Sequence, residues 1–178
     1  MEITEKIFEL TDELGPEKIV YIYEPRAKTK AIVVIDNVAA GPAIGGVRMA
    51  PDVTTEEVRR LARAMTYKNV LAELPHGGGK AGIPEHPYTT NKEQVIRTFA
   101  RGIKNLKEYI PGPDMGTDEA SMAYVYDEIS RAVGLPRELG GIPLDEIGAT
   151  AYGLSICADI AKDYIRAELS KTYHTRVW

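Results

Sequence analysis

The sequence predicts an α/β domain, with a mixed, mostly parallel sheet flanked by helices in a three-layer-like arrangement. Runs rich in β-branched residues alternate with segments of helical periodicity. Stretches rich in glycine and proline separate these segments. The 178 residues suffice for one ordinary domain, and a hydrophobic content of 44% lets the chain bury a core.

The first half of the chain contains two predicted helices and a hairpin. Residues 2–15 have the pattern of a short amphipathic helix, which Gly15-Pro16 ends. The runs "KIVYIYEP" and "AIVVIDNV" form a hairpin through "RAKTK". The stretch "AAGPAIGGVRMAPD" is expected to be a loop. A helix then runs from Thr54 to about Leu74, and Glu57 gives it a capping box.

The second half is expected to alternate loops with three helices. "LPHGGGKAGI" is predicted to be a glycine loop followed by a short apolar stretch, "AGI". "IPGPDMGTD" is a loop or a strand end, and "GLPRELGGIPLDEIG" is a loop. The helices run from Thr90 to about Tyr109, from Thr117 to about Val133, and from about Thr150 to Leu169.

Composition excludes several classes of function. The net charge of −4 argues against a nucleic-acid interface. Cys157 is the single cysteine and cannot form an internal disulfide, which fits a reducing cytoplasm. There is no signal-peptide core and no apolar run of membrane-spanning length, so no membrane partner is expected. The histidines lack metal-like spacing, so no metal is expected either.

The helix from Thr54 carries a polar pair next to its buried stripe. Asn69 falls inside the stripe, and Lys68 falls on its edge. Lys68 has the alternative of a lysine whose stem lies on the core and whose amine reaches water. Asn69 has the alternative of a buried amide bonded to backbone carbonyls. Such a pair suits a helix that lines a cleft. The stripe comprises Val58, Leu61, Ala62, Met65 and Ala72.

Lys80 lies twelve residues after Lys68, beyond the three glycines. A glycine turn would let both amines face one cavity, where repulsion and desolvation lower a lysine pKa. Such a pair suits an anionic substrate, with Asp114 of "GPDMGTD" as the carboxylate that moves protons. A surface turn with a solvated lysine, and a turn aspartate, are the alternatives. The G-x-G-x-x-G spacing of residues 77–82 is no dinucleotide fingerprint, because a helix precedes it.

Four motifs resemble one enzyme family over roughly Val20 to Asp163. They are "GPAIGGVRM", "ARAMTYKNVLAELPHGGGKAGI", "PGPDMGTDEASMAYVYDE" and "GATAYG". In this order and spacing they resemble the N-terminal domain of the glutamate/leucine/phenylalanine/valine dehydrogenases.

The resemblance implies a role for each matching residue. Lys68 would bind the substrate α-carboxylate, Lys80 would polarise the substrate carbonyl and the attacking water, and Asp114 would shuttle protons. Ile44 and Met65 are placed with the substrate-binding residues. Gly45 and Gly46 would abut the substrate through their backbone, and Thr150 would lie near the nicotinamide.

The resemblance also implies a reaction and a domain plan. Family members carry out reversible oxidative deamination of an amino acid with NAD or NADP. Residues 1–148 match the N-terminal domain, 149–169 a hinge or crossover helix, and 170–178 an unrelated tail. The nucleotide-binding domain is expected to be absent. We therefore expect the substrate-binding and oligomerisation half of such an enzyme, truncated, inactive alone and without a bound dinucleotide.

Partners and alternatives follow from the same plan. A homo-oligomer is expected, and a separate nucleotide-binding subunit is one way to complete the enzyme. The alternative is a non-catalytic, stand-alone oligomerisation or amino-acid-binding module derived from the family. Ile44 stands where glutamate enzymes commonly have a lysine, so leucine, valine or phenylalanine would be favoured over glutamate. Alternatively, Ile44 is only a core residue.

Overall fold

The computed structural model describes residues 8–9, 11–144 and 146–165. It forms two compact units, residues 1–141 and 142–178. The second unit contains α5 (Ala149–Ile165). The first unit contains the strands β1 (Lys18–Glu24), β2 (Thr29–Asn37), β3 (Ala43–Met49), β4 (Gly77–Ile83) and β5 (Tyr109–Pro113), and the helices α2 (Thr55–Leu71), α3 (Lys92–Gly102) and α4 (Glu119–Ile129), followed by a 3₁₀ turn, Arg137–Leu139.

The strands form one mixed sheet in the order β1-β2-β4-β3-β5. β2 is antiparallel to both of its neighbours, β1 and β4. β3 is parallel to both of its neighbours, β4 and β5. Four strands therefore point in one direction and β2 alone runs against them. The predicted α/β class and the predicted β1–β2 hairpin are confirmed.

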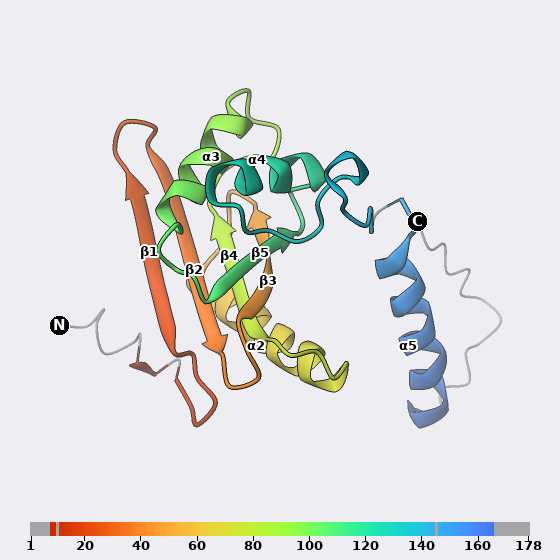
Figure 1. Ribbon diagram of the computed structural model, residues 1–178. Coiled ribbons are helices and arrows are strands. Elements are labelled where there is room, and N and C mark those ends of the chain that lie inside the picture. The colour runs from red at the N-terminus through yellow and green to blue at the C-terminus, as the bar shows by residue number, and fades with distance from the viewer. Residues whose placement is uncertain (1–7, 10, 145, 166–178) are drawn as a thin grey trace. The chain divides into compact units, whose positions relative to one another are not determined.

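Helices cover the sheet on both faces. α2 packs on one face through Val58 and Ala62, which contact Val34 of β2. α3 and α4 pack against each other and cover the opposite face with a larger core that includes Phe99 and Met122. Figure 1 shows α3 and α4 next to each other and α2 apart from them. The predicted three-layer arrangement is confirmed.

Two segments that were predicted to be loops are strands. Residues 43–49 form β3, and residues 77–83 form β4, every residue of which is buried. A strand buried on both faces shows no alternation of polar and apolar residues. Glycine also counts against a strand by propensity. The prediction of a glycine loop is therefore wrong. Packing on both faces of the sheet outweighs the low strand propensity of glycine in β4.

The predicted helices exist, but their ends differ. α3 begins after Asn91 instead of Thr90 and ends at Gly102, and Tyr109, the expected end of the helix, instead begins β5. α4 ends at Ile129, before Ser130 in the left-handed region (φ 53°). The N-cap Thr54 is confirmed, since its hydroxyl accepts the backbone N–H of Glu57 at 3.2 Å.

Three further expectations concern the ends of the chain. Residues 2–7 and 10 of the first predicted helix lie outside the described residues, as does the whole tail 170–178. Residues 11–15 form a turn with a bridge between Asp12 and Gly15, so the helix prediction is wrong there, because the Asp12 carboxylate accepts the Leu14 N–H and favours a turn. α5 begins at Ala149, close to its expected start, and residues 166–169 of the expected helix also lie outside. Among the helices that the structure describes, none is long and apolar enough to cross a membrane.

Candidate functional site

The glycines of β4 let α2 lie directly on the sheet. A Cβ on Gly78 would come within 2.1 Å of the Thr66 nitrogen and 2.5 Å of the Ala62 carbonyl oxygen. Real Cβ atoms do not approach backbone so closely, so only glycine fits under the helix here. This contact brings the helix that carries Lys68 against the strand that carries Lys80.

The contacts of α2 show which way its edges face. Glu57 contacts Arg48 of β3, so this edge of the helix overlooks β3. Lys68 lies on the same edge about three helical turns later. Lys68 is exposed and forms no ion pair with the described residues. Buried Asn69 donates from Nδ2 to the Gly77 carbonyl at 2.7 Å, so its amide is bonded to backbone, as the alternative reading had it.

Lys80 and Asp114 form an ion pair at this side of the sheet. The Lys80 Nζ lies 3.1 Å from the Asp114 Oδ2, and the Lys80 side chain is only 6% exposed. Burial lowers the pKa of Lys80, the Asp114 carboxylate opposes this shift, and the positive charges of Arg48 and Lys68 add to it. The sequence analysis predicted this lowering of the Lys80 pKa.

A turn after β5 holds Asp114 in place. The Thr117 N–H donates to the Asp114 carbonyl at 2.9 Å, and the Asp114 N–H donates to the Thr117 hydroxyl at 3.0 Å. That hydroxyl donates to the Val47 carbonyl at 2.8 Å, which ties the turn to β3. Asp114 is therefore both a turn residue and the partner of Lys80.

The paired glycines have different neighbours. A Cβ on Gly46 would lie 2.6 Å from the Asp114 Cβ, so Gly46 borders the ion pair. A Cβ on Gly45 would collide with the Gly79 carbonyl oxygen at 1.5 Å. The Gly45 carbonyl also accepts the buried hydroxyl of Tyr109 at 2.8 Å. The structure thus brings Gly46 to the acid and packs Gly45 against β4 and Tyr109.

The remaining predicted site residues lie on three different elements, β3, α2 and α5. Ile44 is half-buried on β3, on the same face as Gly46 because side chains alternate along a strand. Met65 is half-buried on α2. Thr150 is exposed in the first turn of α5, in the second unit, and its role stays a prediction.

Sequence reasoning missed Arg48, which completes the cluster. Its Nε donates to the Asp114 Oδ2 at 2.9 Å, and its Nη1 lies 2.5 Å from the Glu57 Oε1. Glu57 was expected only as a member of a capping box. A strand assignment for residues 43–49 would have placed Arg48 on the face of Gly46, two residues away.

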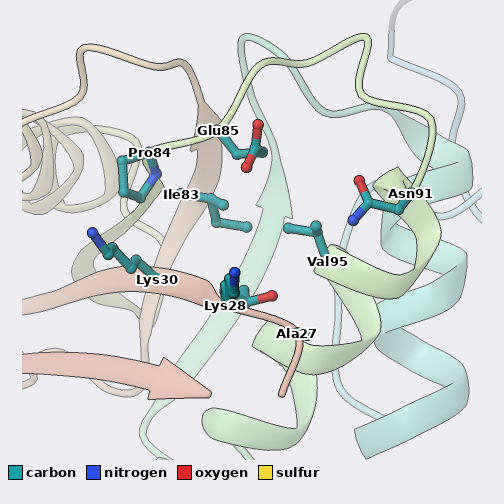
Figure 2. A pocket seen from close by; sticks show the side chains of 9 residues that line it. Ala27, Lys28, Lys30, Ile83, Pro84, Glu85, Asn91 and Val95 are labelled. Carbon is teal, nitrogen blue, oxygen red and sulfur yellow. The ribbon is translucent and has the colours of Figure 1, made fainter. Parts of the chain in front are cut away.

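A separate cavity of about 180 Å³ lies where the β1–β2 turn meets the end of β4 and the start of α3. Figure 2 shows Lys28 and Lys30 at this cavity together with Glu85 and Asn91. Both lysines are exposed, and Glu85 adds a carboxylate to the same lining. The buried ion pair of Lys80 is not part of its lining, so the predicted site lies elsewhere.

The G-x-G-x-x-G spacing of residues 77–82 does not form a dinucleotide-binding turn. The G-x-G-x-x-G spacing lies inside the buried strand β4 and not in a turn between a strand and a helix. A Cβ on Gly79 would meet the Tyr109 ring at 2.9 Å, and one on Gly82 would meet Val58 at 2.7 Å. These glycines serve packing and leave no cradle for a pyrophosphate.

The fold and the cluster define an α/β domain with a buried lysine–aspartate pair beside a helix-borne lysine. A family model described as the Glu/Leu/Phe/Val dehydrogenase dimerisation domain matches residues 19–131. The chain is 36% identical over 140 residues to the phenylalanine dehydrogenase of Thermoactinomyces intermedius. It is 36% identical over 156 residues to the leucine dehydrogenase of Geobacillus stearothermophilus. The chain therefore belongs to the Glu/Leu/Phe/Val dehydrogenase family and contains its N-terminal domain.

The chain spans less than half the length of these relatives. The two alignments cover 76% and 84% of this chain but 38% and 42% of the relatives. The fold resembles the L-tryptophan dehydrogenase of Nostoc punctiforme with a TM-score of 0.63 and 29% identity, covering 74% of this chain and 39% of that one. It resembles the hetero-hexameric glutamate dehydrogenase of Thermus thermophilus, in a Leu-bound form, with a TM-score of 0.70 and 26% identity, covering 92% and 46%.

Proposed function

We propose that this chain provides the amino-acid-binding and subunit-association part of an NAD(P)-dependent amino-acid dehydrogenase. The reaction is the reversible oxidative deamination of an L-amino acid to a 2-oxo acid and ammonium. The observation that supports this most is the cluster in which Lys80 and Asp114 pair beside the edge of α2 that carries Lys68. Membership of the family supports the reaction class.

The charges of the cluster suit a small zwitterion. Lys68 has no ion-pair partner among the described residues, so its ammonium is available to bind the substrate α-carboxylate. Lys80, buried and with a lowered pKa, places its amine where negative charge develops on the substrate oxygen. Asp114 takes the proton of the attacking water and returns it to the leaving amine. Gly46 leaves room beside the carboxylate for this exchange.

Ile44 is the proposed determinant of the side chain that is accepted. It is half-buried on the face of β3 that also carries Gly46. An aliphatic wall offers no partner to a side-chain carboxylate, and an unpaired ion costs several kcal/mol in such a place. Leucine, valine and phenylalanine are therefore preferred over glutamate. If Ile44 is only a packing residue, this preference disappears.

The chain is proposed to self-associate and to need a nucleotide-binding partner for turnover. β1 is an edge strand of the sheet with two exposed tyrosines, Tyr21 and Tyr23, and such an edge favours pairing with another chain. Because its G-x-G-x-x-G spacing lies inside the buried strand β4 and not in a strand–helix turn, the chain is proposed to be inactive by itself. Either NAD or NADP would bind a separate nucleotide-binding subunit.

Calorimetric titration with leucine and with glutamate tests the proposed site. We expect leucine to bind more tightly, and the variant Lys80→Met to bind it more weakly than the wild type. A clear preference for glutamate would refute the role of Ile44, and binding of neither amino acid would refute the site.

Assays of NADH formation separate the catalytic proposal from the alternative of a binding module. The chain alone should form no NADH with any amino acid. Mixed with the nucleotide-binding domain of a relative such as the G. stearothermophilus leucine dehydrogenase, it should form NADH. Binding of leucine without turnover in the mixture would favour the non-catalytic module.

A further inference from the structure

We propose that Arg48, held by Glu57, is the positioning residue that fixes Asp114 against Lys80 and turns its second oxygen toward the open side of the site. The importance of this positioning for catalysis rests on the proposed function. The geometry of the cluster is independent of it.

The four side chains form a line of alternating charge across four parts of the fold. Glu57 comes from α2, Arg48 from β3, Asp114 from the turn after β5, and Lys80 from β4. The successive contacts are 2.5 Å, 2.9 Å and 3.1 Å. The line has two negative and two positive charges, so it is neutral by itself. Lys68 then remains as the positive charge that a substrate carboxylate would neutralise.

Both cations bind the same oxygen of Asp114. The Arg48 Nε and the Lys80 Nζ both contact Oδ2. Oδ1 forms no hydrogen bond with the described residues, and the Asp114 side chain is 20% exposed. A carboxylate oxygen that two donors hold leaves its partner oxygen free to accept a proton. Without Arg48, Lys80 alone would hold Asp114, and the carboxylate could rotate about its last bond.

The side chains of the cluster become more exposed from Lys80 to Glu57. The side chains of Lys80, Arg48 and Glu57 are 6%, 18% and 37% exposed. The partly buried guanidinium needs compensation on both sides, which Asp114 and Glu57 supply. Arginine suits this place because its planar group offers several N–H donors in a fixed geometry, so it can bind two carboxylates at once.

The charged groups that face Lys80 allow the effect of removing Arg48 on the Lys80 pKa to be predicted. They are Asp114, Arg48 and Lys68, whereas Asp36 of β2 is tied to Arg63 and Thr66 on the other edge of α2. Removal of Arg48 takes away a positive charge near Lys80. It also leaves Asp114 with Lys80 as its only cation. Both changes favour the protonated amine.

The test is a pH titration of the Lys80 signal by NMR in protein labelled with ¹³C at the lysine ε carbon. Lys80→Arg assigns the signal. In Arg48→Met the titration midpoint should move to higher pH than in the wild type. Arg48→Lys, which keeps the charge, should restore most of the wild-type midpoint. The control Arg59→Met removes an arginine of similar exposure, 20%, that binds Glu56, and should leave the midpoint unchanged.

The outcomes separate this inference from the proposed function. An unchanged midpoint in a folded Arg48→Met protein would overturn the positioning role, and so would an equal shift in Arg59→Met. If Arg48→Met fails to fold, Glu57→Gln should move the midpoint by a smaller amount to lower pH, because it leaves the positive charge of Arg48 less compensated, and no shift there would overturn the role. Titration of the wild type with leucine is the separate test of the site, because its failure leaves the Lys80 midpoints interpretable.

Discussion

The two edges of α2 carry two ion clusters of opposite character. On the β2 edge, Arg63 binds Asp36 at 2.9 Å and Asp12 at 2.7 Å, and Asp36 is fully buried and also accepts the Thr66 hydroxyl at 2.6 Å. On the β3 edge, the line from Glu57 to Lys80 includes Asp114, whose side chain is partly exposed and is held through Oδ2 alone. Lys68, on the same edge, has no ion-pair partner among the described residues. We call the β2 edge the closed edge and the β3 edge the open edge.

The difference between the edges distinguishes a cluster suited to stability from one suited to binding. Arg63, Asp36 and Asp12 are all paired with one another among the described residues, so this cluster offers a ligand no unpaired charge and holds α2 on the sheet. On the β3 edge, Lys68 has no ion pair and the Asp114 Oδ1 has no hydrogen bond to any residue in the described part of the chain. Such unpaired polar groups at a partly buried place are what a binding site needs.

The largest expected effect comes from breaking the closed edge. Asp36→Asn removes a buried charge and leaves the partly buried Arg63 with only its exposed partner, Asp12. Loss of one member of a buried pair is strongly destabilising, so we expect the free energy of unfolding to fall by about 3 kcal/mol or more. Urea unfolding measures this change. The matched change Asp114→Asn, at a side chain that is 20% exposed, should cost clearly less. Equal losses would remove the distinction between the edges.

A second change, Gly78→Ala, pushes α2 away from the sheet between its two edges. Gly78→Ala would place a Cβ at 2.1 Å from the backbone of α2, so the helix has to shift. Overpacking of this kind costs about 1–3 kcal/mol of stability. It should also weaken leucine binding, because Lys68 moves away from Lys80. Gly112→Ala is the control, since its nearest neighbour is a Val133 methyl at 3.0 Å. A Gly78→Ala protein as stable as Gly112→Ala would contradict the packing argument.

The sequence predicts those elements of the fold whose signals lie within one short segment. The capped start of α2 and the β1–β2 hairpin have local signals and were predicted. The strand nature of residues 43–49 and 77–83 was not, because burial of both faces erases the alternation that marks a strand.

The same limit applies to the site. Lys68, Lys80 and Asp114 stood out by their motifs, and the structure brings Lys80 and Asp114 into contact. Arg48 reaches Asp114, 66 residues further along the chain, only because β3 pairs with β5, and Glu57 reaches Arg48 only because α2 docks on the sheet. Their partners follow from strand order and helix docking, which no single segment encodes.

A third change removes the free cation of the open edge. Lys68→Met should weaken leucine binding by about tenfold or more, because a charge-assisted hydrogen bond contributes roughly 1.5–3 kcal/mol. Stability should hardly change, since Lys68 is exposed and has no ion pair among the described residues. Calorimetry measures both quantities. Lys104→Met, another exposed lysine, should bind leucine as the wild type does, and equal weakening in both variants would argue against a specific carboxylate contact.

The smallest expected effect is a pH dependence from Lys80. Burial lowers the pKa of Lys80 below its ordinary value of 10.5. Between the folded and the unfolded pKa the unfolded state therefore binds more protons, and the free energy of unfolding rises with pH. Lys80→Met should flatten this rise relative to the wild type. Urea unfolding at several pH values below 10.5 measures the difference. Parallel curves for the two proteins would contradict the inferred shift.

The most direct test of the account follows the resonances of both edges of α2 during a titration with leucine. In protein labelled on its lysine and arginine side chains, the account predicts that the signals of Lys68, Lys80 and Arg48 move with one common binding curve. The Arg63 signal should stay in place, because its cluster is closed. Movement of Arg63 with unchanged Lys68 and Lys80 signals, or no movement of any of these signals at saturating leucine, would contradict the claim that the open edge is the amino-acid site.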